Sequence, residues 1–437
     1  MKNLFLSCIL FCMTLSGTSQ FVPQPLNYPG SGYWPYFISI TDPDHVWIGT
    51  FHESGLPYSF SVKTTDGGDS WIFDSIPVAG FPICASICGW DSNTCYHVYD
   101  DLNSTTDPSV WKTTDGGSTW SNIITTQFTG SFINFYHAFS ADTGLAMGDP
   151  RDGYFEIQLT NDGGSTWTRV PSSEIPAILP NEIGLNHSYS TIGNSIWFTT
   201  SKTRCFRSTD RGQTWEVSEV VPGVNLDLGV CFSSEQKGVI WNRGSNTSQI
   251  VVTTDGGITW DTASFPAGYT IQDMSRVPGF EAGFVVTAYR TGMTVYFTPD
   301  LFNTLQVIQS SILSNGAVEF YDAATGWLGG GESGTNEIYK YTGLLTSANE
   351  ILNPERKLSI FPNPSISEAI VKFPAYSDSK HLELRITDLN GKLIDKYLLN
   401  PSGLSKLNAT NYENGLYFLE VFEGNDFVTR VKWVVIH

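Results

Sequence analysis

The segment KTTDGGSTW, Lys112 to Trp120, decides the fold because it recurs along the chain. Copies stand at 63–71 (KTTDGGDSW), 159–167 (LTNDGGSTW), 207–215 (RSTDRGQTW) and 252–260 (VTTDGGITW). The aspartates of the five copies are Asp66, Asp115, Asp162, Asp210 and Asp255, and Asp300 belongs to a sixth, degenerate copy. By subtraction they lie 49, 47, 48, 45 and 45 residues apart. A steady period of this length is typical of a β-propeller or a solenoid.

The residue types of the motif favour a turn rather than a catalytic site. An aspartate carboxylate accepts hydrogen bonds from nearby backbone N–H groups, and glycine tolerates the positive φ of a tight hairpin. The tryptophan offers a large apolar face for packing on a neighbouring unit. Because a catalytic site needs no near-identical copies around a ring, we assign the five well-preserved aspartates a structural role.

A second feature recurs out of phase with the first, as a β-type stretch, a turn and a short apolar strand. It has seven copies, from ISITDPDHVWIG at 38–49 to EFYDAATGWLGGG at 319–331. Four short strands per repeat, without a helical period, predict an all-β fold with a seven-bladed β-propeller over 21–345. The last repeat lacks a fourth strand, so we expect FVPQPLNY, 21–28, to supply it and close the ring.

The N-terminus and the composition indicate an exported protein. Residues 1–20 combine Lys2, an apolar run and small residues, which is typical of a cleaved signal peptide. No later stretch is long and apolar enough to predict a transmembrane segment. The net charge of −19 argues against nucleic acid as a partner. We expect no cofactor or metal. The acidic loops leave room for a calcium ion, but no ligand pattern supports one.

Five cysteines remain after the signal peptide, and they lack the paired spacing of a zinc site. Export permits disulfides, so the sequence is compatible with bridges or with buried thiols. Their pairing is left open for Cys84, Cys88, Cys95, Cys205 and Cys231.

The aspartate segments resemble the Asp-box, or BNR, repeat, S/T-x-D-x-G-x-T-W. This repeat occurs in sialidases, some endoglucanase propellers, sortilin-like receptors and the photosystem II stability/assembly factor. The region from Phe139 to Trp215 is most similar to bacterial secreted relatives of that assembly factor. The resemblance implies a propeller with peripheral, structural boxes, and it transfers little chemistry.

The C-terminal region differs in character, with a polar linker at 346–357 and short alternating strands over 358–437. These strands predict a small Ig-like β-sandwich. The order Pro362-Asn363-Pro364, Asn390-Gly391-Lys392, Gly415-Leu416-Tyr417 and a basic strand at 430–432 resembles the type A sorting domain of the type IX secretion system. The resemblance implies a Bacteroidota-type cell, the type IX machinery as a partner, and release or attachment at the cell surface.

Two unusual connections mark a candidate ligand site. We letter the four strands of a blade A to D in chain order. The D–A and B–C connections then share one face of the ring, and the turns with the aspartate motif share the other. Segment 148–155 is the B–C loop of blade three, and 170–188 is the long D–A loop into blade four. They contribute the candidate ligand-binding residues Asp149, Arg151, Asp152, Glu174, Glu182 and His187. Ordinary turn and loop roles remain an alternative for all six.

Two functions follow from these loops. The first is a binding protein that holds an extracellular protein, glycan or surface ligand through its channel face. The alternative is a glycoside hydrolase with a carboxylate pair drawn from Asp149, Asp152, Glu174 and Glu182. A sialidase is disfavoured, because no arginine precedes Arg151 and an early one is needed for the substrate carboxylate. The acidic stretch 99–109 is interpreted as a solvated loop.

Overall fold

The computed structural model of the protein describes residues 20–437, except 29–32, 53–58, 81, 102–106, 221–226, 244–248, 313, 331–336, 347–357, 374–381, 389–391, 401 and 424–425. Residues 1–19 of the predicted signal peptide therefore lie outside the described part. The chain divides into two units, Met1–Leu345 and Thr346–His437, and each is described by itself.

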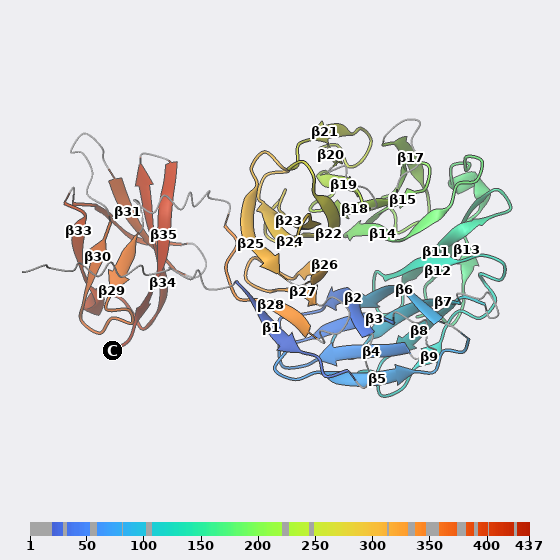
Figure 1. Cartoon of the computed structure of the whole chain (residues 1–437), viewed down its shortest axis with the longest axis horizontal. Helices are drawn as coiled ribbons and strands as arrows, with labels where there is room; N and C mark the ends of the chain where they lie inside the picture. The colour runs from blue at the N-terminus through green and yellow to red at the C-terminus, as the bar shows by residue number, and fades with distance from the viewer. Residues whose placement is uncertain are drawn as a thin grey trace, which may run out of the picture. The chain divides into compact units, whose positions relative to one another are not determined.

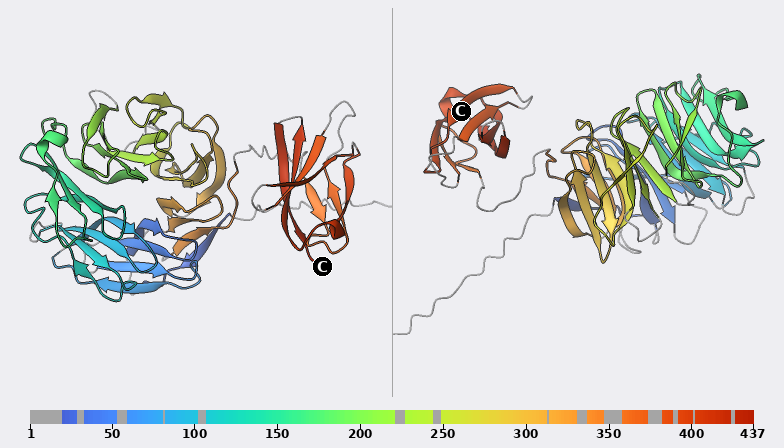
Figure 2. Two further views of the ribbon diagram at one scale, coloured as in Figure 1. Left: turned by 180° about the vertical axis from the view of Figure 1, so that it is seen from behind. Right: turned by 90° about the horizontal axis from the view of Figure 1, so that it is seen from above.

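The first unit contains, among its described residues, seven four-stranded antiparallel sheets arranged as blades of a ring (Figure 1). Figure 2 shows the same ring from behind and from above. The predicted seven-bladed propeller is thus confirmed.

Blades one to three hold β2 (Tyr33–Ile40), β3 (Val46–His52), β4 (Ser59–Thr64), β5 (Ile72–Ile76); β6 (Pro82–Gly89), β7 (Cys95–Asp101), β8 (Ser109–Thr113), β9 (Ser121–Asn122); and β10 (Ile133–Ala138), β11 (Gly144–Arg151), β12 (Tyr154–Thr160), β13 (Thr168–Arg169). Blades four and five hold β14 (Gly184–Ile192), β15 (Ser195–Thr200), β16 (Arg204–Ser208), β17 (Glu216–Glu219); and β18 (Leu228–Phe232), β19 (Gly238–Asn242), β20 (Ile250–Thr253), β21 (Asp261–Ala263). Blades six and seven hold β22 (Thr270–Arg276), β23 (Phe284–Tyr289), β24 (Met293–Thr298), β25 (Gln306–Ile312); and β26 (Ser314–Phe320), β27 (Gly326–Gly330), β28 (Glu337–Tyr341), β1 (Phe21–Pro25).

The ring closes through the first described strand. β1 pairs antiparallel with β28, with Phe21 opposite Tyr341 and Pro25 opposite Glu337. Phe21 is 1% exposed, and its ring packs against Tyr341 with centroids 5.2 Å apart. The expectation that the N-terminal segment completes blade seven is confirmed, and no free strand edge remains at this seam.

The hydrophobic core of the propeller is divided among the interfaces between blades. Each of seven clusters of described buried residues joins two neighbouring blades, and the cluster at the seam joins blade seven to blade one. Stacked pairs span these interfaces: Phe135 lies 4.2 Å from Tyr189, and Trp197 lies 3.8 Å from Phe232, between ring centroids. Stacking between aromatic side chains of neighbouring blades therefore contributes to holding the ring together.

A hydrogen bond also links successive innermost strands at one repeated position. A side chain on one strand accepts a backbone N–H of the next strand around the ring. The acceptor–donor pairs are Ser39 Oγ with Gly89 (2.9 Å), Cys88 Sγ with Ala138 (3.5 Å), Ser190 Oγ with Phe232 (2.8 Å) and Ser275 Oγ with Phe320 (2.9 Å).

The aspartate motif forms the turn between the third and fourth strands of a blade. Asp162 Oδ1 accepts the Thr160 hydroxyl (2.9 Å) and the Thr166 N–H (2.8 Å), and Asp162 Oδ2 accepts the Thr166 hydroxyl (2.6 Å). Gly163 and Gly164 have φ of 70° and 96°, which favours glycine. The carboxylate is thus occupied within its own turn.

The degenerate sixth copy keeps the same hydrogen bonds to its aspartate, although it has no glycine after that residue. Asp300 Oδ1 accepts the Thr304 N–H at 2.7 Å, although Leu301 and Phe302 carry φ of 55° and 67°. The tryptophan of the motif packs between blades, as expected: Trp167 Nε1 of blade three donates to the Ile123 carbonyl of blade two at 2.9 Å.

The second unit consists of a three-stranded and a four-stranded sheet. Their strands are β29 (Ser359–Phe361), β30 (Glu368–Lys372) and β33 (Leu404–Asn408), and β32 (Leu393–Leu398), β31 (Leu382–Thr387), β34 (Gly415–Glu423) and β35 (Asp426–Val435). A short 3-10 turn, η3 (Ala409–Asn411), follows β33. Trp433 and Leu384, both fully buried, lie in the core between the sheets.

The Pro-Asn-Pro segment of this unit is held against its last strand. Asn363 Nδ2 donates to the Lys432 carbonyl at 2.7 Å, and Asn363 Oδ1 accepts the Val434 N–H at 2.8 Å. Ser365 Oγ accepts the Trp433 indole N–H at 2.8 Å. This motif therefore joins the first strand region of the domain to its C-terminal strand. The predicted turn at Asn390-Gly391 lies outside the described residues.

Candidate functional site

Glu182, a predicted ligand residue in the long D–A loop, supports the loop from inside. Its side chain is fully buried, and its carboxylate pairs with Arg204, whose Nε lies 2.9 Å from Oε1. The carboxylate also accepts the Thr200 hydroxyl (2.5 Å) and the Leu179 N–H (2.8 Å). Both carboxylate oxygens thus accept hydrogen bonds from the protein, and these bonds hold the pKa of Glu182 below its usual value despite burial. Glu182 therefore shapes the loop and does not face a cavity.

Arg151 and Asp152 take part in an ion cluster on blade three. Arg151 and Arg169 both contact the fully buried carboxylate of Glu156, at 2.8 and 3.0 Å. Asp152 lies at the hairpin turn with φ of 59° and pairs with Arg169 at 2.9 Å. The two arginines offset the burial of Glu156. Arg151 and Asp152 do not line the central cavity described below.

Glu174 is exposed at the end of the short 3-10 turn η1 (Ser172–Glu174). Its carboxylate accepts the hydroxyl of the adjacent Ser173 at 3.0 Å. Its backbone carbonyl accepts the Trp215 N–H at 2.9 Å, which anchors the loop to the tryptophan of an aspartate motif. Glu174 is also absent from the lining of the central cavity.

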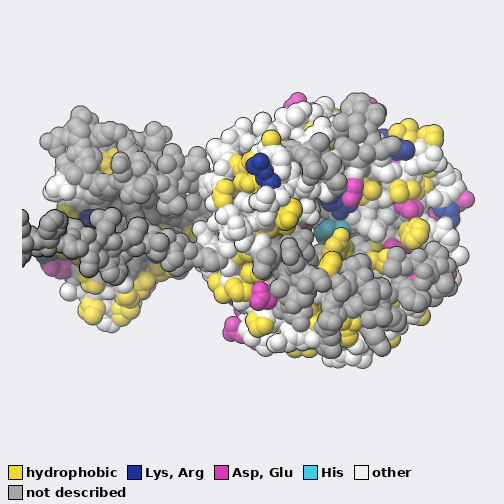
Figure 3. Space-filling model, in the orientation of Figure 1, with side chains coloured by type: hydrophobic (Ala, Val, Ile, Leu, Met, Phe, Trp, Pro, Cys, Tyr) yellow, Lys and Arg dark blue, Asp and Glu magenta, His cyan; other side chains and the backbone are white. Residues whose placement is uncertain are grey.

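The other two predicted residues, Asp149 and His187, line a cavity of about 840 Å³. The cavity lies at the ends of innermost strands and beside B–C connections. This is the face of the ring on which the candidate ligand site was predicted from the sequence. In Figure 3 the middle of the ring is hollowed, and histidine, basic and acidic side chains meet hydrophobic ones there. The described lining residues of the cavity include Trp34, Tyr36, Phe37, Ile83, Cys84, Phe132, Asn134, Ile183, Leu185, Asn186, Asp227, Arg243, Gln272 and Asp273.

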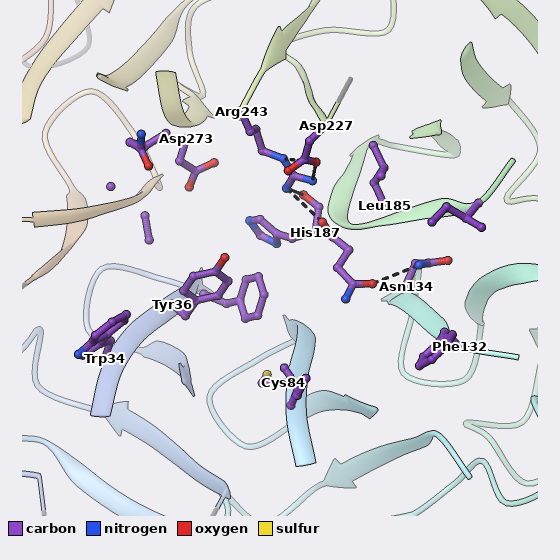
Figure 4. Close-up of a pocket in the computed structure, with 18 of the residues that line it drawn as sticks. Trp34, Tyr36, Cys84, Phe132, Asn134, Leu185, His187, Asp227, Arg243 and Asp273 are labelled. Atoms are coloured by element: carbon purple, nitrogen blue, oxygen red, sulfur yellow. Dashed lines mark hydrogen bonds and ion pairs between the residues drawn. The ribbon is translucent and has the colours of Figure 1, made fainter. Parts of the chain in front are cut away.

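The mouth of the cavity carries large apolar side chains that reach solvent. Tyr36 is 49% exposed, Phe132 is 46% exposed and Ile183 is 48% exposed. They come from blade one, the connection into blade three and the loop into blade four, and all three line the cavity. Figure 4 shows Tyr36 and Phe132 on different elements beside it. Exposed apolar groups around a concave site are typical of a surface that binds a partner.

Arg243 closes one side of the cavity and is already paired. Its guanidinium contacts Asp227 Oδ1 at 2.6 Å and donates to the backbone carbonyls of Asn186 (3.1 Å) and His187 (3.4 Å). Figure 4 shows Arg243, Asp227 and His187 together on this side. Burial, with the charge of Arg243, lowers the pKa of His187 to about 3, so this imidazole is neutral at physiological pH. His187 also has φ of 53° and packs on Phe37 at 4.4 Å between ring centroids.

Two half-buried carboxylates of the cavity are fixed by backbone donors. Asp149 Oδ1 accepts the Gly184 N–H at 2.9 Å. Asp273 accepts the Met274 N–H at 2.8 Å and the Val318 N–H at 3.0 Å. Burial raises the pKa of Asp149, and raises that of Asp273 to about 6. Asp273 therefore carries a negative charge at pH 7.5 in a partly desolvated place.

The acidic stretch 99–109 differs from its interpretation as a solvated loop. Asp100 and Asp101 end strand β7 and are only 6% and 4% exposed. Asp100 Oδ1 accepts the Ile133 N–H of the next blade at 3.2 Å, and burial raises its pKa to about 7. The interpretation was wrong here because strand B continues further than the sequence suggested. Residues 102–106 lie outside the described part.

Sequence reasoning missed Asp227, Arg243 and Asp273, as well as the aromatic groups of blade one. A usable signal was present for Arg243, which follows the last residue of strand B in blade five, because Asp100 and Asp149 also lie near the ends of their B strands. Aligning all repeats at that position would have shown which strand ends meet at the channel face. The bulge between Ile271 and Asp273, which re-aims Asp273, has no clear sequence mark.

The described cysteines form no disulfide. Cys84, Cys88, Cys95, Cys205 and Cys231 are free and buried. Among the residues that the structure describes, no group of three or more His, Cys, Asp or Glu side chains is placed to hold a metal ion. In the same described part, no helix is long and apolar enough to cross a membrane.

Comparison with known families identifies the second unit. Residues 359–436 match the family described as the secretion system C-terminal sorting domain. The predicted sorting domain is confirmed, and the chain is an exported β-propeller that is secreted or held at the cell surface. No curated protein matches the chain.

Solved structures that resemble the chain include propellers. The structure of YCF48 bound to D1 peptide has 16% identity and a TM-score of 0.56, covering 75% of this chain and 98% of that one. YCF48 from Cyanidioschyzon merolae has 16% identity and a TM-score of 0.52, covering 73% and 98%. At this identity the likeness shows the fold alone. The GH74 enzyme of Niastella koreensis is 14% identical over 96% of this chain and 75% of that chain. Its TM-score of 0.48 is too low to support an inference.

Proposed function

We propose that the propeller is an exported binding protein that holds an extended polypeptide segment in the cavity of its channel face. The observation that carries the proposal is the cavity of about 840 Å³, with Tyr36, Phe132 and Ile183 exposed at its mouth. Its volume falls within the usual range for a ligand site. Apolar side chains with a few fixed polar groups suit a peptide of mixed character.

The fold supports this use. YCF48 has been solved with a D1 peptide, so a propeller of similar fold holds a peptide. In this chain, the aliphatic groups of Ile83, Ile183 and Leu185 favour peptide side chains over the hydroxyl-rich surface of a glycan.

No described arrangement favours the alternative hydrolase. Of the four carboxylates considered for a catalytic pair, Asp149 alone lines the cavity. Glu182 is paired with Arg204, Asp152 is paired with Arg169, and Glu174 is exposed to solvent. A glycosidase needs two carboxyl groups facing one another across a cleft.

The test is binding of a random capped hexapeptide library to the purified exported chain, with a glycan array in parallel. Phe132→Ala is expected to reduce peptide retention about tenfold, because it removes an aromatic contact at the mouth. The matched control is Ile258→Ala, which truncates a side chain that is 58% exposed on the turn of an aspartate motif. Glycan binding with turnover, or peptide retention that ignores Phe132→Ala, would contradict the proposal.

A further inference from the structure

One corner of the cavity gathers side-chain oxygen atoms around a glycine. Asn134 on β10, Asp149 on β11 and Asn186 on β14 all line the cavity near Gly184. A Cβ on Gly184 would lie 2.2 Å from Asn134 Oδ1, so the close approach of these groups requires glycine at this position. We name Asn134, Asp149 and Asn186 the acceptor corner.

The charge of the acceptor corner is not balanced by the protein. Asp149 accepts hydrogen bonds from the Gly184 backbone N–H and from the Asn134 side-chain amide, and both of these donors are neutral. Within the described residues, no lysine, arginine or histidine lies at ion-pair distance from Asp149. Arg243, the basic side chain of the lining, is paired with Asp227. A half-buried carboxylate without a cation is costly unless a ligand supplies one.

A buried amide oxygen points to the same kind of ligand. Asn134 is 3% exposed, and its Nδ2 donates to Asn186 Oδ1 at 3.1 Å. Its Oδ1 atom is buried and has no hydrogen-bond partner among the described residues. An unmet buried acceptor costs free energy until a donor reaches it. The corner thus combines one buried acceptor that has no donor with a carboxylate that has no cationic partner among the described residues.

A second carboxylate reinforces the potential of the cavity. Asp273, on the blade-six side, is held by two backbone N–H groups and has no ion-pair partner in the part of the chain that the structure describes. With Asp227 and Arg243 compensating one another, Asp149 and Asp273 leave the lining negative. A cationic ligand group is therefore favoured over an anionic one.

We propose that the acceptor corner binds the ammonium group of a lysine side chain in the bound polypeptide. This inference rests on the proposed peptide-binding function and names its recognised residue. An ammonium has three donors and a compact charge, which suits several oxygen acceptors that converge on one point. Phe132 and Leu185, which line the cavity beside the corner, provide apolar surface for the aliphatic stem of the lysine.

The experiment uses three capped hexapeptide libraries with random flanks and one fixed central residue. The central residue is lysine, N-acetyl-lysine or norleucine, and retention on the immobilised exported chain is measured for each library. Lysine peptides are expected to be retained about tenfold more than the two uncharged sets, as for one charge-assisted hydrogen-bonded contact. This comparison needs no protein variant, so it does not depend on the folding of a mutant.

The protein variants then locate the contact. Asp149→Asn keeps an oxygen for the Gly184 N–H and removes the charge, so the lysine preference is expected to disappear. Asp152→Asn is the matched control: it changes the same charge three residues away, outside the cavity lining. Melting temperatures verify that both variants are folded.

The outcomes separate this inference from the function on which it rests. Equal retention of all three libraries, or an unchanged lysine preference in Asp149→Asn, overturns the lysine site while peptide binding stands. Retention of none of the libraries above that of the heat-denatured protein overturns both.

Discussion

Lys340 Nζ donates to the carbonyl oxygen of Gly67 at 2.6 Å, across the seam between blade seven and blade one. The same contact recurs between other blades: Lys63 donates to the Gly116 carbonyl, and Lys112 donates to the Gly163 carbonyl at 3.0 Å. The lysine that begins KTTDGGSTW therefore binds the aspartate-motif turn of the next blade. This contact is part of what makes the motif a joint between repeats.

Lys340→Met is expected to destabilise the propeller by about 1–2 kcal/mol, because it removes a charged donor from a backbone carbonyl. The measurement is urea unfolding of the exported chain. Lys112→Met, which removes the equivalent bond inside the ring, is the matched variant and should cost a similar amount. If Lys340→Met left the stability unchanged while Lys112→Met lowered it, strand β1 alone would secure the seam.

Phe21→Ala is expected to cost about 3–5 kcal/mol, because the ring of Phe21 is buried against Phe320 and Tyr341. Val22→Ala, on the same strand at a side chain that is 44% exposed, should change stability by less than about 0.5 kcal/mol. Thermal and urea unfolding of the two variants test whether β1 is an integral strand of blade seven. Equal effects of the two substitutions would contradict that assignment.

Glu182→Gln is expected to destabilise the protein by about 3–5 kcal/mol, because it leaves the Arg204 guanidinium buried without its counter-charge. Glu174→Gln alters an exposed carboxylate of the same loop and should be nearly neutral. Peptide retention by folded Glu182→Gln should remain as in the parent protein. Loss of binding without loss of stability would return Glu182 to the list of ligand residues.

The ring was predictable from sequence because its signal is local and repeated. The spacing of Asp66 to Asp300 counts the turns, and the missing fourth strand of the last repeat points to the segment beginning at Phe21. Each inference required only the pattern within one repeat. The role of Lys340 was not predictable in this way, because its partner Gly67 is 273 residues distant and belongs to another repeat.

The candidate site was predictable only as a face. Asp149 and Glu182 both stand in unusual connections, and nothing in their immediate sequence distinguishes a cavity carboxylate from a buried one. The difference arises from tertiary partners: Arg204 approaches Glu182, whereas no cation approaches Asp149 in the described residues. The β-bulge between Gly184 and Tyr189, which brings His187 to the cavity, is likewise set by strand pairing.

Acid is expected to unfold the propeller mainly between pH 4 and 2, through the aspartate motifs. Hydrogen bonds from Thr119 and Thr166 lower the pKa of Asp115 and Asp162 to about 2, compared with 3.8 in an unfolded chain. A lowered carboxyl pKa adds stability above pH 3.8, and this stability is lost as the pH falls toward 2. Asp162→Asn should therefore be less stable than the parent at pH 6, with a difference that shrinks by pH 2.5.

Urea unfolding at a series of pH values measures that difference. Asp69→Asn, at an exposed residue of an equivalent turn, provides the control for removal of one carboxylate from the motif. A constant gap between Asp162→Asn and the parent across the whole range would show that the motif carboxylates do not set the acid limit.

Binding of lysine peptides is expected to weaken roughly tenfold between pH 7.5 and pH 5. Burial brings the pKa of Asp273 to about 6, so this carboxylate loses its charge as the pH falls through this range; burial raises the pKa of Asp149 as well. The ligand ammonium keeps its charge throughout, because its pKa is about 10.4. His187 stays neutral, with a pKa near 3, and Arg243 remains paired with Asp227.

Dissociation constants of one retained lysine peptide and its norleucine analogue, measured from pH 5 to pH 8, test this expectation. The affinity of the lysine peptide should fall as the pH falls. The affinity of the norleucine analogue should stay constant, because this peptide has no charge that the carboxylates could attract. Asp149→Asn should make the two profiles converge. A lysine peptide that binds more tightly at pH 5 would place the recognised group away from Asp149 and Asp273, since protonation of either carboxylate can only reduce attraction for a cation.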